Sequence, residues 1–200
     1  MGARARIITA ALCAAFATTQ AAGQTTAYAP GDGTPNSLQL NIPVTASVGV
    51  ACGFSTAPSG THNEPDFDTH AWSHDFPFTL DCSIASRVAV VSTNGALLTG
   101  GAAPAGYTTS APYDVALHVV QNSGSADATC AVANLQTGGS CSFRGPASAG
   151  LGGAGLNVAV SQNQPGSYLR VSAPAYSGAN VLVASPGYAD TLVVTLSPAA

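Results

Sequence analysis

The sequence predicts an all-β protein, an antiparallel sandwich of roughly eight or nine short strands. Glycine, proline, serine, threonine and asparagine interrupt the chain roughly every 8–12 residues, a spacing typical of sandwiches. Between these interruptions lie short apolar segments, several of which alternate with polar residues, and signals for helix starts and ends are almost absent. A chain of strands without interposed helices favours two packed antiparallel sheets.

The first 23 residues have the pattern of a secretory signal peptide. Arg4 and Arg6 give a positive start, residues 7–17 are apolar, and small residues follow at 21–23. The apolar stretch is shorter than the ~20 residues that cross a bilayer as a helix, although a retained anchor is the alternative. We therefore expect an exported chain that begins near Gln24, with residues 24–37 as a flexible polar leader.

The longest alternating segment, residues 37–52, follows this leader. Its length exceeds the ~5–6 residues of an ordinary strand, and Pro43, which lacks an N–H, prefers an edge or a break. Either the segment bends and serves two sheets, or its first half pairs with something else. The odd positions hold polar or small residues, whereas the even positions hold apolar residues: Leu38, Leu40, Ile42, Val44, Ala46, Val48, Val50 and Cys52.

Further strands are expected at 76–82, 87–92, 113–120, 156–161, 167–172, 180–184 and 190–196. Asn94 and Gly95 are a turn signal after the second of these. Residues 130–135 and 141–144 are expected to form a hairpin around Gly138 and Gly139. Residues 145–155, rich in glycine and alanine, are expected to form a loop.

The cysteines predict two disulfides. Cys13 leaves with the signal peptide, and an even number of cysteines in an exported chain favours disulfide bonds. Three pairings are possible, and we favour the nearest neighbours in the chain, Cys52 with Cys82 and Cys130 with Cys141. Their spacing does not fit a zinc site of the C-x-x-C type.

Charge is scarce and mostly negative. Charged residues make up 7% of the chain, against ~25% in an ordinary soluble domain, and lysine is absent. Without the signal peptide, three arginines face nine acidic residues, which leaves a net charge of −6. This balance excludes nucleic acid and an anionic membrane surface as partners. A surface of small uncharged residues suggests a chain that packs against copies of itself.

One cluster of acidic and histidine residues is a candidate metal site. The preferred interpretation is a solvated loop between the first two strands, because a single row of ligands on a strand rarely converges on one ion. No nucleophile, zinc or phosphate-loop motif of an enzyme is present, so we expect no catalytic residues, no cofactor and no bound metal. The cluster comprises His62, Glu64, Asp66, Asp68, His70, His74 and Asp75.

Both ends of the mature chain resemble a known family. Residues 41–48 (NIPVTASV), followed four residues later by Cys52, resemble the mature N-termini of archaic and alternative chaperone–usher pilins. Residues 186–196 (PGYADTLVVTL) resemble the closing motif of the spore coat protein U-like domain in those pilins, where a Gly-Tyr-x-Asp turn leads into the last strand. The middle of the chain fits only loosely, and residues 125–185 depart most.

The resemblance implies an incomplete immunoglobulin-like antiparallel sandwich, residues 49–200, completed by donor-strand exchange. Residues 38–48 would be the donor strand, with Leu38, Leu40, Ile42, Val44, Ala46 and Val48 entering the groove of a neighbouring subunit. The implied partners are a periplasmic chaperone, an outer-membrane usher and further pilin copies. The chain would pass through the periplasm to an extracellular fimbria that serves adhesion or biofilm formation. The alternative function is a secreted monomeric binding domain that holds a metal ion through residues 62–75.

Overall fold

The computed structural model describes residues 51–200, except residues 151, 186 and 200. They belong to one compact unit, Val48–Ala200. The signal peptide, the leader and the donor strand expected at residues 1–48 lie outside the described residues. Within the described part of the chain, no helix is long and apolar enough to cross a membrane.

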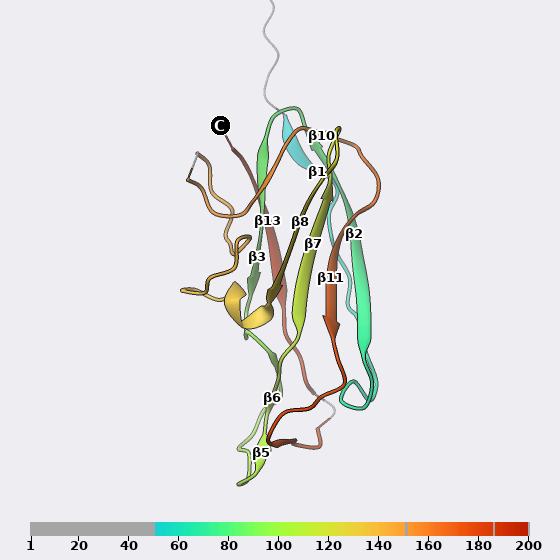
Figure 1. The fold of residues 1–200 in the computed structure, drawn as a ribbon, viewed down its shortest axis with the longest axis vertical. Coiled ribbons are helices and arrows are strands. Elements are labelled where there is room, and N and C mark those ends of the chain that lie inside the picture. The colour runs from blue at the N-terminus through green and yellow to red at the C-terminus, as the bar shows by residue number, and fades with distance from the viewer. Residues whose placement is uncertain (1–50, 151, 186, 200) are drawn as a thin grey trace, which may run out of the picture. The chain divides into compact units, whose positions relative to one another are not determined.

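Two antiparallel sheets form the sandwich (Figure 1). The first sheet contains, in spatial order, β1 (Cys52–Thr56), β2 (Trp72–Cys82), β11 (Ser167–Ala173), β7 (Asp114–Val120) and β8 (Ser125–Ala131). The short strand β10 (Ser161–Gln162) also pairs with β2. The second sheet has the order β13 (Leu192–Pro198), β3 (Ser86–Ser92) and β9 (Leu156–Val158). The expected all-β antiparallel sandwich is therefore confirmed.

Short strand pairs lie at the end of the sandwich where β5 and β6 are drawn in Figure 1. There β4 (Leu97–Leu98) pairs with β6 (Ser110–Ala111), antiparallel. The neighbouring pair, β5 (Tyr107–Thr108) and β12 (Val181–Leu182), is parallel. The remaining element is a single 3₁₀ turn, η1 (Val132–Leu135).

The core lies between the sheets and follows the alternation of the strands. In β7, Val115, Leu117 and Val119 point inward and are almost fully buried, while the intervening residues are exposed or half-buried. On β3, Val88 and Val90 face them from the other sheet and are fully buried. The other large core side chains are Phe78, Leu80, Tyr113, Val132, Leu135, Phe143, Val158, Leu169 and Val171.

Both expected disulfides are present. The bond between Cys52 and Cys82 joins two residues that are directly opposite each other on β1 and β2. The bond between Cys130 and Cys141 joins β8 to the segment after η1. Disulfides persist in oxidising compartments, so this pairing supports an exported protein.

The expected hairpin of residues 130–135 and 141–144 is wrong. Residues 125–131 instead form β8, which pairs with β7 through a tight turn in which the Gln121 amide donates to the Gly124 carbonyl. The chain then turns inward through η1, because Val132 and Leu135 gain full burial in the core. Residues 143–145 hydrogen-bond to Val90 of β3 rather than to residues 130–135.

The strands expected between residues 76 and 120 and between residues 156 and 196 are present with shifted ends. β1 begins only at Cys52, where the alternating segment of residues 37–52 ends, so most of that segment lies outside the described residues. β2 begins at Trp72, four residues earlier than expected, so His74 and Asp75 lie on a strand and not in a loop. The strand expected at 156–161 divides into β9 and β10, and the one expected at 180–184 shrinks to β12. Three of the two-residue strands, β4, β5 and β6, were not predicted, because segments this short show no alternation.

Candidate functional site

The last strand, β13, is only partly covered on its inner side. Leu192, Val194 and Leu196 lie opposite Ser92, Val90 and Val88 of β3, so they face the same core. The three β3 residues are buried, whereas the three β13 residues keep part of their surface exposed. Beyond β13, no further described strand pairs with its outer edge. Within the described part of the chain, the sandwich therefore lacks a cover along this strand.

The opposite side of the sandwich is closed, which makes the open side distinctive. The chain between β8 and β9 fills the space between the two sheets there, with Val132, Leu135 and Phe143 fully buried. The amide of Val90 donates to the Phe143 carbonyl at 2.9 Å, and the amide of Gly145 donates to the Val90 carbonyl at 2.9 Å. The second disulfide fixes this closure to β8.

A second unpaired segment faces β13 across the opening. After β1 ends at Thr56, residues 58–62 continue past β2, and we call them the rim segment. Among the described residues, no backbone hydrogen bond joins residues 57–65 to β13 or to any other strand. β1 begins at the end of the sandwich where β13 ends, since Cys52 lies opposite Cys82 and the amide of Ala199 donates to the carbonyl of Ala85. The rim segment, which continues β1, therefore runs in the opposite direction to β13.

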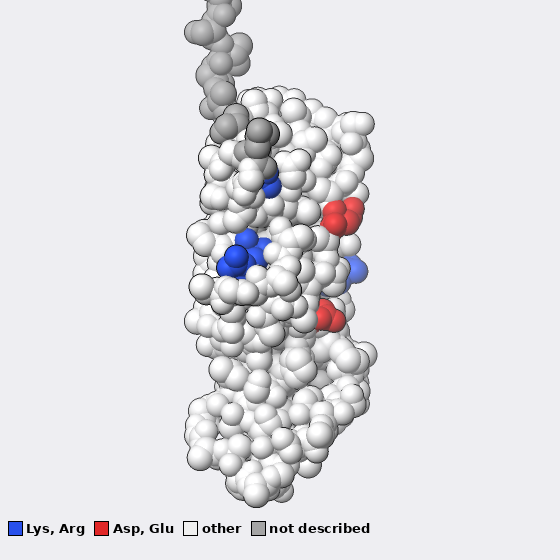
Figure 2. All heavy atoms as spheres, turned by 60° about the vertical axis from the view of Figure 1, so that its left-hand side comes forward, with Lys and Arg blue, Asp and Glu red and all other residues white. Residues whose placement is uncertain are grey.

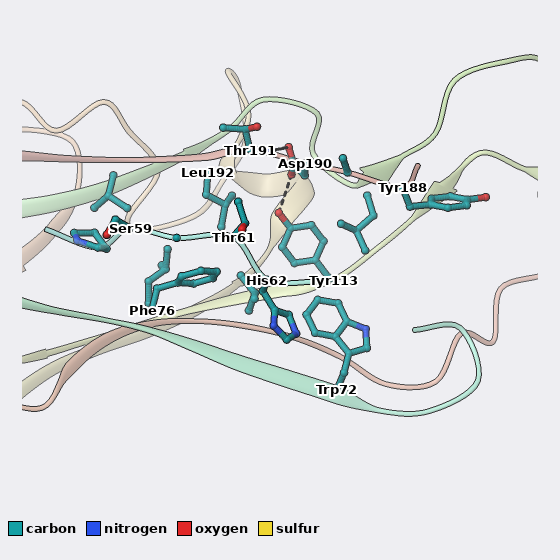
Figure 3. A pocket seen from close by; sticks show the side chains of 17 residues that line it. Ser59, Thr61, His62, Trp72, Phe76, Tyr113, Tyr188, Asp190, Thr191 and Leu192 are labelled. Atoms are coloured by element: carbon teal, nitrogen blue, oxygen red, sulfur yellow. Dashed lines mark hydrogen bonds between the residues drawn. The ribbon is translucent and has the colours of Figure 1, made fainter. Parts of the chain in front are cut away.

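A groove of about 420 Å³ lies between the rim segment and β13. Figure 3 shows Trp72, Tyr113 and Phe76 on its inner wall, with Leu192 and Thr191 on the β13 side. The indole N–H of Trp72 is buried and has no hydrogen-bond partner among the described residues. The full lining is Pro58, Ser59, Gly60, Thr61, His62, Trp72, Phe76, Leu97, Tyr113, Leu169, Val171, Tyr188, Ala189, Asp190, Thr191, Leu192 and Val194.

The carboxylate of Asp190 fixes one end of the groove. Its Oδ2 accepts hydrogen bonds from the hydroxyls of Ser92 (2.6 Å) and Tyr113 (2.7 Å). Its Oδ1 accepts from the backbone amides of Asn94 (3.0 Å) and Thr191 (2.7 Å). Burial raises the pKa of Tyr113, and the hydrogen bond to Asp190 raises it further, so its hydroxyl stays protonated. Asp190 therefore ties the start of β13 to β3 and to the groove wall.

Replacing Asp190 by asparagine is expected to destabilise the protein by about 2–3 kcal/mol, because an amide nitrogen would face a donor and leave it unsatisfied. The shift in the urea midpoint measures this cost. Asp114→Asn is the matched control, because Asp114 is exposed. It should change the midpoint very little. Equal midpoints for the two variants would contradict the role of Asp190.

Part of the predicted histidine and acidic cluster gathers at the rim segment. Nε2 of His62 lies 3.0 Å from Oε2 of Glu64, and Nε2 of His70 lies 2.9 Å from Oε1 of the same carboxylate. The rings of His62 and His74 stack with centroids 4.1 Å apart. The hydrogen bond from His70 is the largest cause that lowers the pKa of Glu64.

The rest of that cluster lies apart. Asp75 is bonded twice by the guanidinium of Arg170 on β11, at 2.6 and 2.8 Å, which lowers the pKa of its carboxyl. Asp66 and Asp68 sit in an exposed turn, where the Asp66 carbonyl accepts from the amide and hydroxyl of Thr69. Across the described residues, no group of three or more potential ligands is arranged to hold a metal ion.

The sequence-based candidates therefore divide into three groups. The disulfide cysteines pair as expected. The histidine and acidic residues are brought together only in part. The donor-strand residues, Leu38, Leu40, Ile42, Val44, Ala46 and Val48, lie outside the described residues. The groove itself was not located from the sequence, although the Gly-Tyr-x-Asp turn at 187–190 marks one end of it.

Comparison with known proteins gives no relative. No protein-family model, no curated protein and no solved structure matches this chain significantly. As far as residues 51–199 are described, the fold and the groove define a class of protein: a disulfide-bonded antiparallel sandwich with one side open between two unpaired edges.

Proposed function

We propose that the protein is a structural subunit of a surface fibre, and that its groove accepts an extended strand from a second copy. The observation that carries this proposal is the open side of the sandwich, where partly exposed Leu192 and Val194 lie between two edges without backbone partners. An extended peptide suits such a site, because its main chain satisfies the edges and alternate side chains fill the groove.

The occupant we assign is residues 38–48 of a second copy. These residues carry an apolar side chain at every second position. In an extended strand such side chains all point to one face, so that face can pack against the apolar wall of the groove. The competing occupant is the N-terminal segment of the same copy, and such self-insertion would give a monomer. Insertion into a second copy is instead a head-to-tail contact, which gives a filament when it does not close into a ring.

The charge distribution favours self-association over a charged partner. Figure 2 shows a face on which most atoms belong to uncharged residues, with a few scattered arginines and acids. Arg170 is paired with Asp75, and Arg87 donates to the carbonyls of Gly150 and Gly155. Surfaces of this kind pack together with little desolvation of charge.

The proposal includes the role and partners that the family resemblance implies. The fibre is a chaperone–usher fimbria, the subunit is not an enzyme, and a periplasmic chaperone and an outer-membrane usher handle it before assembly. An unfilled apolar groove is an aggregation hazard in a free subunit, which gives a physical reason for a chaperone that covers it.

Deleting residues 37–48 is expected to abolish polymerisation while leaving a folded acceptor subunit. The exported protein is analysed on non-reducing gels without heating, where a fibre gives a ladder of oligomers. The deletion variant should run as a monomer and should bind a synthetic peptide of residues 38–48. Deleting residues 25–36 instead is the control and should keep the ladder.

Three outcomes would contradict the proposal. The first is a full-length protein that runs only as a monomer, which would indicate self-insertion. The second is a ladder from the variant without residues 37–48, and the third is the failure of this variant to bind the peptide.

A further inference from the structure

A proton-sensitive group lies on one wall of the groove. His62 belongs to the rim segment and lines the groove, and its imidazole stacks on His74 of β2, with an angle of 9° between the ring planes. Glu64 joins His62 to His70 through its two carboxylate oxygens. Since the rim segment has no backbone hydrogen bonds to β2 among the described residues, these side-chain contacts hold it in place.

The charges around the stack decide how it responds to acid. In the loop, Glu64 contacts His62 and is also bonded to His70. On β2, Asp75 follows His74 in the chain and interacts with it electrostatically. From β11, Arg170 neutralises Asp75, and across the groove Asp190 is occupied by four donors. Trp72 and Phe76, the aromatic neighbours of the two imidazoles, carry no charge. Of the carboxylates in the described residues, Glu64 is thus the one in direct contact with His62.

Protonation therefore changes the stack from attractive to repulsive. One positive imidazole is accommodated, because Glu64 is beside it and a cation over a neutral aromatic ring is favourable. Two positive rings stacked at 4.1 Å repel each other. Acid, which protonates imidazoles, is therefore the condition under which the two rings repel.

We propose that the stacked pair His62 and His74 is an acid-released latch that holds the rim segment against β2 and controls access to the groove. At neutral pH the latch is closed and the rim segment narrows the groove. In mild acid the two rings separate, the rim segment moves away from β2, and an incoming strand enters faster. The effect on strand entry rests on the proposed function, whereas the release of the rim does not.

Glu64 sets the lower limit of this response. Its pKa is lowered in the folded protein, so the stability that it contributes is present above its unfolded pKa and is lost only as pH falls through the lowered folded value. An unperturbed glutamate has a pKa of about 4.3. Glu64 therefore keeps its negative charge beside His62 to a lower pH than a free glutamate would.

Trp72 is a built-in reporter for the first test. It is the single tryptophan of the chain, and its ring centroid lies 6.1 Å from that of His62. The subunit without residues 37–48 is titrated from about pH 7.5 to about pH 5 while its emission is recorded. We expect a red shift as the solution is acidified, because the rim segment exposes the indole to water. His74→Phe keeps a ring for stacking but not the second charge, so it should show no transition.

Two further variants control for folding and for other histidines. His74→Gln removes the charge with a smaller side chain and should also abolish the transition. His118→Phe changes a histidine on β7 that stacks on Tyr168 and does not line the groove, so the transition should remain. A transition that persists in both His74 variants, or is absent from the parent subunit, would overturn the latch.

The second test measures entry of the synthetic peptide of residues 38–48. Binding to the parent subunit should be about fivefold faster or more at pH 5.5 than at pH 7.5, and His74→Phe should remove this difference. Equal rates in the parent at both pH values would overturn control of access. A normal Trp72 transition with no peptide binding at any pH would refute the proposed function and leave the latch intact.

Discussion

Replacing Ile42 or Val44 by aspartate is expected to reduce the yield of polymer about a hundredfold or more. Both residues occupy the even positions of residues 38–48, and the proposed function places even positions against the apolar wall of the groove. A carboxylate buried without a partner costs several kcal/mol, and each 1.4 kcal/mol is about a factor of ten in affinity. The measurement is the oligomer ladder of the exported protein on unheated non-reducing gels.

The odd positions provide matched controls within the same segment. Asn41→Asp and Thr45→Asp add the same charge on the other face of the strand, so the ladder should persist with modest losses. Placing aspartate in turn at each position from Leu38 to Val48 should give yields that rise and fall with a period of two. A flat profile, or one with its minima at Gln39, Asn41 and Thr45, would refute the donor strand.

The energy available to the donor segment explains why single residues matter. Four or five buried apolar side chains that each lose ~100 Å² of accessible surface gain about 10 kcal/mol before ordering costs, at ~25 cal/mol per Å². Loss of translational freedom and ordering of the segment consume much of this gain. The margin that remains is therefore comparable with the cost of one misplaced carboxylate.

Strands that alternate on their own could be predicted from the sequence. The strands expected at 87–92, 113–120 and 167–172 correspond closely to β3, β7 and β11, whose inner residues are buried against each other. The pairing of the cysteines also followed from their order in the chain. In these cases local pattern and tertiary burial favour the same structure.

Where burial competes with a local turn signal, the prediction failed. Gly138 and Gly139 suggested a hairpin, but Val132, Leu135 and Phe143 are all fully buried, and the chain between them follows this burial. The start of β2 was missed because its residues 72–75 carry histidine and aspartate. Pairing with β11 stabilises this stretch, where Arg170 lies opposite Asp75 and bonds to it.

The groove could not be located from the sequence because its two edges are far apart in the chain. Residues 58–62 show no alternation, and they lie at an edge because they follow β1, which pairs with β2 and is bonded to it by the Cys52–Cys82 disulfide. β13 looks like an ordinary strand in the sequence. Its exposure follows from the absence of another described strand beside it, which is a property of the fold.

Val194→Asp is expected to give a subunit that donates a strand but does not accept one. Val194 lines the groove, and a carboxylate there would meet Leu192 and the apolar inner wall. Val193 is the neighbouring control, because its side chain points out of the sandwich and is 49% exposed. Val193→Asp should therefore polymerise normally, whereas Val194→Asp alone should leave monomers.

Combining the two defective subunits tests both halves of the contact at once. The subunit without residues 37–48 can only accept, and Val194→Asp can only donate, so their mixture should form a one-to-one dimer and nothing larger. Intact disulfides in mass spectrometry check the fold of Val194→Asp separately, because a donor segment binds even as a free peptide. A ladder from Val194→Asp alone would show that the groove beside β13 does not accept the strand. A mixture that stays monomeric, with both subunits folded, would show that residues 37–48 do not fill it.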